Sequence, residues 1–146
     1  MIRAVSIRRG RSGTWDTLKL IHMMGLEGSK NDGVNQFVMT IPVNQWEAML
    51  RTYWQYQAEN QETLRGVAKQ VEIFMRTGHM IGDCDDVAVV IAALCISSHL
   101  PFKIVAVRRP EDQDFSHVFV EALQFRFDPT APDNADYRYW ERMVYP

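Results

Sequence analysis

Three residues in the second half of the sequence have the side chains of a thiol nucleophile, its proton acceptor and an orienting carboxylate: Cys84, His117 and Asp128. A thiolate can attack an amide carbonyl, an imidazole can move the proton, and a carboxylate can fix the imidazole tautomer. His117 begins one predicted strand and Asp128 ends the next. A hairpin centred between Ala122 and Leu123 would pair the two directly, with Cβ atoms about 4.5–5.5 Å apart. Ala-Leu is a poor two-residue turn, so we expect a longer or bulged loop.

Cys84 opens a predicted helix that is apolar on nearly every face. The N–H groups and the dipole at a helix start favour an anion, so they can stabilise a thiolate and the oxyanion of a tetrahedral intermediate. Asp83, Asp85 and Asp86 oppose this effect, because nearby carboxylates raise the pKa of a thiol. We expect the carboxylates to point away, with Asp83 as the helix cap and Asp86 on further N–H groups. An adjacent imidazolium would offset the remaining repulsion.

Each member of this set also has a purely structural interpretation. Cys84 alone is more often a structural cysteine, and His117 alone a satisfied strand residue. Asp128 before Pro129 could simply begin a turn. Spacing alone therefore leaves the catalytic and the structural interpretations open.

The two cysteines, Cys84 and Cys95, do not pair if one helix carries both. Eleven positions on a helix span about 16 Å, whereas a disulfide needs Cα atoms within about 7 Å. Cys95 lies among apolar residues and is interpreted as a core residue. The three aspartates around Cys84 could instead bind a hard metal ion. Capping explains them more simply, so we expect neither a metal nor a cofactor.

Hydrophobic periodicity places helices first and strands afterwards. Apolar residues recur at helical spacing before Cys84, and the apolar run after it fits a buried helix. Gly78 and His99 stand where helices end and a left-handed conformation is expected. The expected helices are 14–24, 46–54, 64–75 and 84–97, and the expected strands are 2–7, 102–107, 116–121 and 125–128, with 34–41 open between helix and strand.

This order predicts an α+β fold, in which N-terminal helices and a buried Cys-bearing helix pack on a small antiparallel sheet. A length of 146 residues suits a single domain, and 47% apolar and 23% charged residues are ordinary for a folded protein. The net charge of -2 gives no global field for nucleic acid. Arg8, Arg9 and Arg11 are interpreted as a solvated end.

No apolar run in the sequence reaches the roughly 18 residues that a membrane span needs. The first ten residues, MIRAVSIRRG, lack the apolar stretch of a secretory signal. We therefore expect no membrane partner and a cytoplasmic, reducing location.

The segment GDCDDVAVVIAALCISSHLPFKIVAV, which contains Cys84, resembles the signature of the transglutaminase-like superfamily, in which Gly-x-Cys opens a helix that ends near a Pro-led strand. FSHVFVEA resembles the His-bearing strand of that family, and FRFDPT its Asp-bearing strand. ENQETLRG resembles the approach segment of small bacterial and phage relatives. The resemblance covers about residues 62–130. His99 replaces the usual Gly after the helix, and the hairpin after His117 is short.

The resemblance implies a papain-like, transglutaminase-like core within one domain over residues 1–146. It makes Cys84 the nucleophile, His117 the general base and acid, and Asp128 the orienting residue. The implied protein is a cysteine-dependent acyl-transfer enzyme that acts on peptide or side-chain amide bonds through an acyl-thioester. Gln70 and the tryptophans are the candidates for a side-chain oxyanion donor.

Hydrolysis, as in a cysteine peptidase or amidase, is favoured over transfer to an amine, because water is always available and the sequence indicates no amine pocket. The expected partner is a peptide or protein substrate. The alternative, from another class, is a noncatalytic binding or assembly module that retains the fold. The acidic surroundings of Cys84 motivate this alternative, and the oligomeric state is open.

Overall fold

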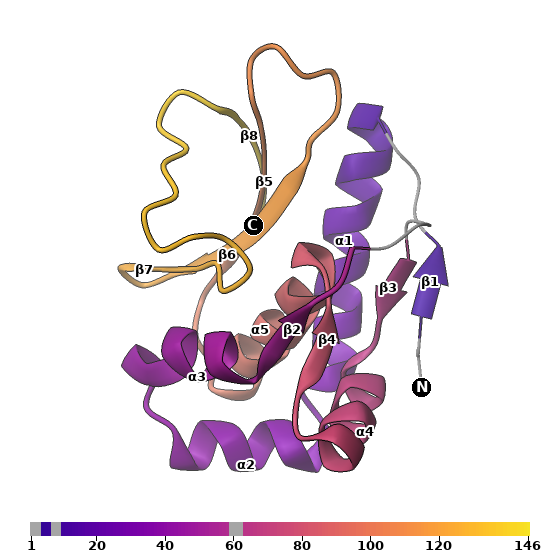
Figure 1. Ribbon diagram of the computed structural model, residues 1–146, viewed down its shortest axis with the longest axis vertical. Coiled ribbons are helices and arrows are strands. Elements are labelled where there is room, and N and C mark those ends of the chain that lie inside the picture. The colour runs from indigo at the N-terminus through magenta and orange to yellow at the C-terminus, as the bar shows by residue number, and fades with distance from the viewer. Residues whose placement is uncertain (1–3, 7–9, 59–62) are drawn as a thin grey trace.

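The computed structural model describes residues 4–6, 10–58 and 63–146. The helices form one layer of the molecule and a four-stranded sheet forms the other (Figure 1). The first helix and the Cys-bearing helix lie against one another, and both contact the sheet. The helices are α1 (Gly10–Gly28), α2 (Asp32–Thr40), α3 (Trp46–Tyr53), α4 (Val67–Thr77) and α5 (Cys84–Ser97), with a 3-10 turn at Val43–Gln45 before α3.

The main sheet is antiparallel and has the strand order β7-β6-β5-β8. Its strands are β5 (Lys103–Arg108), β6 (His117–Ala122), β7 (Phe125–Phe127) and β8 (Glu141–Tyr145). Two small ladders accompany it, antiparallel β1 (Ala4–Ser6) with β3 (Thr63–Arg65) and parallel β2 (Trp54–Tyr56) with β4 (Met80–Gly82). The predicted α+β fold with an antiparallel sheet is therefore confirmed.

The four-stranded sheet separates two sets of buried side chains. Its inner face packs on α5 and α1. Its outer face carries a smaller cluster around Phe119, covered by residues 128–140, which contain neither helix nor strand and which we call the strap. The inner-face residues are Ile104, Ala106, Val118, Val120, Ala122, Phe127 and Met143.

Local signals at both ends of α5 explain why this helix forms over the predicted residues. Asp83 accepts hydrogen bonds from the N–H groups of Asp85 and Asp86, and the Asp86 side chain accepts one from the N–H of Asp83, which completes a capping box. At the other end, His99 has φ 59, the left-handed conformation that was expected after this helix. The predicted helix over 84–97 is therefore confirmed at both ends.

Other predicted boundaries differ from the structure. α1 continues past Gly25 to Gly28, so Gly25 lies inside the helix and does not end it. An added Cβ at Gly25 would be 2.7 Å from the Cβ of Ala92, so α1 and α5 approach closely at this glycine. Residues 34–41 are largely helical, because most of them belong to α2. Asn31 caps the start of α2, where its side chain accepts a hydrogen bond from the N–H of Gly33. The predicted helix 64–75 begins only at Val67, since the residues before it form β3.

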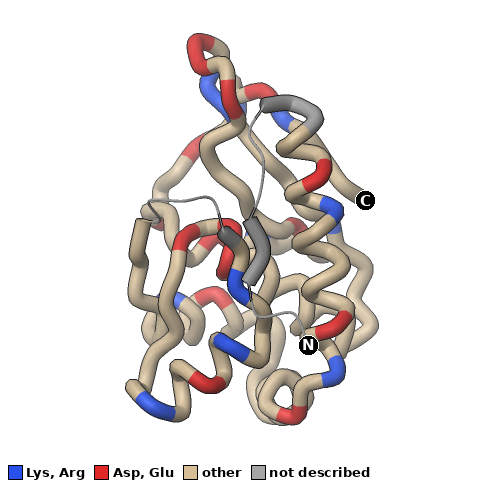
Figure 2. The backbone as a smooth tube through the Cα atoms, turned by 90° about the vertical axis from the view of Figure 1, so that its right-hand side faces the viewer, with Lys and Arg blue, Asp and Glu red and all other residues tan. Residues whose placement is uncertain are grey.

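Of the strand predicted over residues 2–7, the structure describes β1, and the rest lies outside the described residues. Arg8 and Arg9 also lie outside them. In Figure 2, acidic and basic residues are interleaved along the tube, in line with a small net charge of -2.

The predicted register of the hairpin was wrong. Ala122 pairs with Phe125, so the turn consists of Leu123 and Gln124, and Leu123 has φ 55. The centre of the hairpin therefore lies one residue further along than predicted. Because this displaces the partner of each residue by two positions, and side chains alternate with a period of two, every side chain keeps its face.

Candidate functional site

His117 and Asp128 are in direct contact. His117 Nε2 lies 2.5 Å from Asp128 Oδ1, a short, charge-assisted distance. Continuing the observed register would place Asp128 opposite Phe119, two residues from His117 on the same sheet face, which is within reach of a diagonal contact. Contact through Nε2 leaves Nδ1 as the ring nitrogen that could serve a thiol.

Cys84 and His117 line the same pocket, whose volume is about 310 Å³. Cys84 comes from the first position of α5 and His117 from the first position of β6. The structure thus brings all three predicted residues to one place, with Asp128 behind His117. The remaining lining residues are Tyr56, Ser116, Thr130, Ala131, Pro132 and Tyr137.

The surroundings of Cys84 differ from the expectation. The Cys84 sulfur lies 4.0 Å from Asp85 Oδ1, so this carboxylate does not point away. Burial raises the pKa of the Cys84 thiol well above its ordinary value of 9.0, and the charges of Asp85 and Asp83 raise it further. The resting thiol is therefore protonated at neutral pH, whereas the helix start alone was predicted to favour a thiolate.

Asp86, in contrast, points away from the sulfur. It is fully buried and accepts hydrogen bonds from the backbone N–H of Arg65 at 2.7 Å and from Arg65 Nη1 at 3.1 Å. Burial raises the pKa of Asp86 to about 7. Gly82 makes this arrangement possible, because a Cβ there would lie 2.3 Å from Asp86 Oδ2. Among the described residues, no three His, Cys, Asp or Glu side chains are grouped to hold a metal ion.

Asp128 is 3% exposed, and each of its polar atoms has a partner. Its Oδ1 contacts His117 and its Oδ2 accepts from the Tyr137 hydroxyl at 3.0 Å. Its backbone N–H donates to Glu47 Oε1 at 2.9 Å, and its carbonyl accepts from Arg51 Nη2 at 3.0 Å. Asp128 is therefore held at its side chain by residues from a strand and the strap, and at its backbone by two residues of a helix.

Arg51 fixes the beginning of the strap. Its Nη1 donates to the carbonyls of Pro129 and Ala131. Its Nε lies 3.1 Å from Asp133 Oδ1, an ion-pair distance, without the geometry of a hydrogen bond. Glu47, one helical turn earlier, contacts Arg51 Nη2 at 3.1 Å. α3 thus positions the residues that follow β7.

The predicted side-chain oxyanion donors are not at the site. Gln70 is fully buried and uses its amide group on both backbone polar groups of Ile81. The Trp46 indole donates to Ile41, and the Trp54 indole donates to Gly82. The pocket has no tryptophan in its lining. Gln70 and the tryptophans are therefore wrong as candidates for that role.

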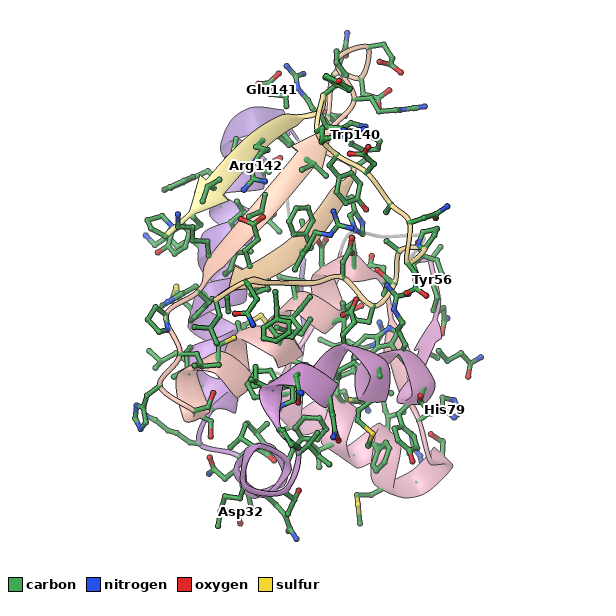
Figure 3. The ribbon with its side chains drawn as sticks, turned by 90° about the vertical axis from the view of Figure 1, so that its left-hand side faces the viewer. Asp32, Tyr56, His79, Trp140, Glu141 and Arg142 are labelled. Atoms are coloured by element: carbon green, nitrogen blue, oxygen red, sulfur yellow. The ribbon has the colours of Figure 1, made fainter. Side chains whose placement is uncertain are left out.

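The sequence did not single out Glu47, Arg51, Tyr56 or Tyr137. In Figure 3, Tyr56 lies at the edge of the molecule, and Trp140, the last residue of the strap, lies beside the sheet. Tyr56 is 60% exposed. The only local signal for any of them is the Glu47–Arg51 spacing of four, which on its own indicates an ordinary surface pair.

Comparison of the chain with protein-family models, with curated proteins and with solved structures gives no match. Within the part of the chain that the structure describes, no helix is long and apolar enough to cross a membrane. The geometry of the site is therefore the basis for inferring a function.

Proposed function

We propose that this protein is a cysteine-dependent acyl-transfer enzyme that acts on peptide or side-chain amide bonds, and that it hydrolyses them. The observation that carries the proposal is the 2.5 Å contact of His117 Nε2 with Asp128 Oδ1 beside a pocket that Cys84 also lines. A buried carboxylate that fixes one imidazole nitrogen leaves the other to accept a proton from a nucleophile.

The chemistry follows from a protonated resting thiol. His117 accepts the thiol proton as the Cys84 sulfur bonds to the amide carbonyl carbon. The C–N bond then breaks, His117 returns the proton to the leaving amine, and an acyl-thioester remains on Cys84. Water attacks the thioester, its proton passes to His117, and cleavage of the C–S bond regenerates the thiol and releases a carboxylic acid.

Donors for the oxyanion come from the pocket itself. The backbone N–H of Cys84 stands at the start of α5, where the helix dipole favours negative charge. Asp83 already occupies the N–H groups of Asp85 and Asp86, so the Cys84 N–H is the donor that this helix start offers. Tyr56 brings a hydroxyl to the same pocket.

A panel of peptide and side-chain amides, assayed with the wild type, Cys84→Ala and His117→Ala, tests the proposal. We expect both variants to lose hydrolysis, while Cys95→Ala, which removes the other, fully buried thiol, keeps it. Mass spectrometry during turnover should find the acyl group on Cys84. Unchanged amidase activity in Cys84→Ala would overturn the proposal.

A second candidate function is a noncatalytic binding or assembly module. The raised pKa of the Cys84 thiol favours it, because catalytic cysteines commonly have lowered values. Iodoacetamide labelling at neutral pH separates the two candidates. If His117 acts as a base, His117→Ala slows the alkylation of Cys84; in a module, the two rates are equal.

The finer fold assignment belongs to the same proposal. A papain-like, transglutaminase-like core is supported by the order of the three residues, with Cys84 at a helix start, His117 at the start of β6 and Asp128 directly after the adjacent strand β7. Both cysteines are free, which suits the cytoplasmic, reducing location expected from the sequence.

A further inference from the structure

We propose that Tyr137 is a positioning residue of this site, which holds Asp128, and through it His117, in the arrangement that accepts the thiol proton. The inference rests on the proposed function and adds a fourth residue to it. Tyr137 belongs to the strap and lines the pocket together with Cys84 and His117.

The two carboxylate oxygens of Asp128 have different partners. Oδ1 contacts His117 Nε2 at 2.5 Å, and Oδ2 accepts from the Tyr137 hydroxyl at 3.0 Å. Rotation of the carboxylate about its terminal bond would break both contacts at once. With the Tyr137 hydroxyl absent, Oδ2 would be an anionic oxygen without this donor, which costs free energy because Asp128 is only 3% exposed.

The Tyr137 hydroxyl is a permanent donor. Burial raises the pKa of its phenol, and the charge of Asp128 raises it further. The phenol therefore stays protonated throughout the pH range in which a protein works. An acceptor role toward Asp128 is excluded, because the carboxylate has no proton to give when it orients an imidazole.

Besides its hydrogen bond to Asp128, Tyr137 packs its ring against four neighbouring side chains. The ring lies 5.3 Å from the ring of Phe119 in a stacked arrangement and 5.0 Å from Trp140 edge to face. The Arg126 guanidinium lies 5.0 Å from its centroid, and the His117 imidazole lies 5.6 Å away, tilted by 33°. Removing only the hydroxyl therefore leaves the ring, and the outer-face cluster, in place.

This residue contacts both members of the His–Asp pair, and it is fixed by the strap. Arg126 Nη2 donates to the carbonyl of Ala135 at 2.7 Å, which ties the strap to β7 just before Tyr137. When His117 gains the thiol proton, Asp128 must stabilise the imidazolium without turning. Tyr137 supplies the restraint on the far oxygen, so its removal lowers the fraction of molecules with a competent pair.

Tyr137→Phe tests the inference, with Tyr139→Phe as the matched control. Tyr139 lies on the same strap but is 82% exposed, so the control loses a hydroxyl of no consequence for Asp128. For amide hydrolysis, we expect kcat to fall about ten-fold in Tyr137→Phe with little change in KM, as typical for loss of a hydrogen bond to a buried charge. Tyr139→Phe keeps the wild-type values.

A double-mutant cycle with Asp128→Asn separates positioning from a general effect on stability. If Tyr137 acts through Asp128, adding Tyr137→Phe to Asp128→Asn causes no further loss of kcat. The ring ¹⁵N chemical shifts of His117 report which nitrogen carries the proton and need no substrate. We expect them to change in Tyr137→Phe and to stay unchanged in Tyr139→Phe.

Identical His117 ¹⁵N shifts in the wild type and in Tyr137→Phe would overturn the inference. Additive losses of kcat in the double-mutant cycle would also overturn it. This result is distinguishable from failure of the proposed function, which Cys84→Ala decides. If Cys84→Ala keeps the amidase activity, the His117 shifts still establish whether Tyr137 positions the pair.

Discussion

Arg51 Nη2 donates a 3.0 Å hydrogen bond to the backbone carbonyl of Asp128, the residue whose side chain contacts His117. The same guanidinium also reaches the carbonyls of Pro129 and Ala131. One helix side chain thus contacts three carbonyl oxygens within the first four residues of the strap, 77 to 80 positions along the chain. Because a guanidinium presents several donors in a planar fork, it suits this task in a way that an ammonium does not.

We therefore expect Arg51→Lys to loosen Asp128 even though the charge is kept. A lysine cannot serve three carbonyls in fixed geometry, so the free energy of unfolding should fall by about 1–2 kcal/mol and amide hydrolysis should slow. Urea unfolding and the rate of hydrolysis measure the two effects. Arg138→Lys is the control, because Arg138 is exposed on the same strap and pairs with Asp136. Equal behaviour of the two variants would contradict this role for Arg51.

Asp85 should control the reactivity of the Cys84 thiol. Its Oδ1 lies 4.0 Å from the sulfur and, after burial, is the main cause of the raised thiol pKa. Asp85→Asn removes the charge and lowers the pKa of the Cys84 thiol. The alkylation rate of Cys84 should therefore begin to rise at a lower pH than in wild type. Below pH 9 we expect iodoacetamide to react roughly three to ten times faster than with wild type.

Asp32→Asn is the control for this experiment, because Asp32 stands in the first turn of α2, at the far end of the molecule from the sheet (Figure 3). Its alkylation profile should match that of wild type. Cys95 is fully buried and should stay unlabelled in the folded protein. A profile of Asp85→Asn that overlies the wild-type profile would show that burial alone sets the thiol pKa.

Asp86 makes stability depend on pH in a predictable direction. Burial raises its pKa from 3.8 to about 7, so between these values the folded protein binds a proton that the unfolded chain does not. The free energy of unfolding therefore falls as pH rises through this window, by up to about 1.4 kcal/mol for each pH unit. Asp86→Asn does not titrate, so its stability relative to wild type should improve from pH 4 to pH 7.

Urea unfolding across that window, with Asp32→Asn for comparison, measures the effect. The difference between Asp86→Asn and wild type reports the titration of Asp86 together with its effect on the neighbouring Asp83 carboxyl group. A difference that stays constant with pH would mean that Asp86 is ionised throughout, in which case Arg65 outweighs the effect of burial.

The sequence predicted best those features that local signals determine. The capping residue Asp83 and the left-handed His99 define α5 within its own neighbourhood. The strand that begins with His117 and the strand that ends just before Asp128 follow from alternation. The face shared by His117 and Asp128 was also predictable, because it depends only on the parity of the register. The register itself was not, since Leu123 and Gln124 form a turn without Gly, Asn or Asp.

What the sequence did not reveal is contact between distant segments. Each strand of the β2–β4 ladder has three residues, too few for a periodic signal, and β8 follows a strap that has no regular structure. Glu47 and Arg51 have the spacing of a surface pair, and nothing local indicates that their partners lie near residue 128. Tyr137 acquires its role only when the strap returns across Phe119.

Gly82 should be the least replaceable glycine near the site, and Gly78 provides a matched comparison. Both have positive φ, 144 for Gly82 and 85 for Gly78. An added Cβ at Gly78 meets nothing within 4 Å, so Gly78→Ala costs only the backbone strain, about 1 kcal/mol. At Gly82 the added Cβ would lie 2.3 Å from Asp86 Oδ2, inside the capping box, so we expect Gly82→Ala to cost at least about 3 kcal/mol. Urea unfolding of the two variants measures the difference. Asp86→Ala removes the carboxylate that the added Cβ would meet, so Gly82→Ala should lower the free energy of unfolding less in the Asp86→Ala protein than in the wild type. Equal losses of unfolding free energy in the two glycine variants would show that the contact with Asp86 relaxes freely, and that backbone strain alone accounts for the cost at Gly82.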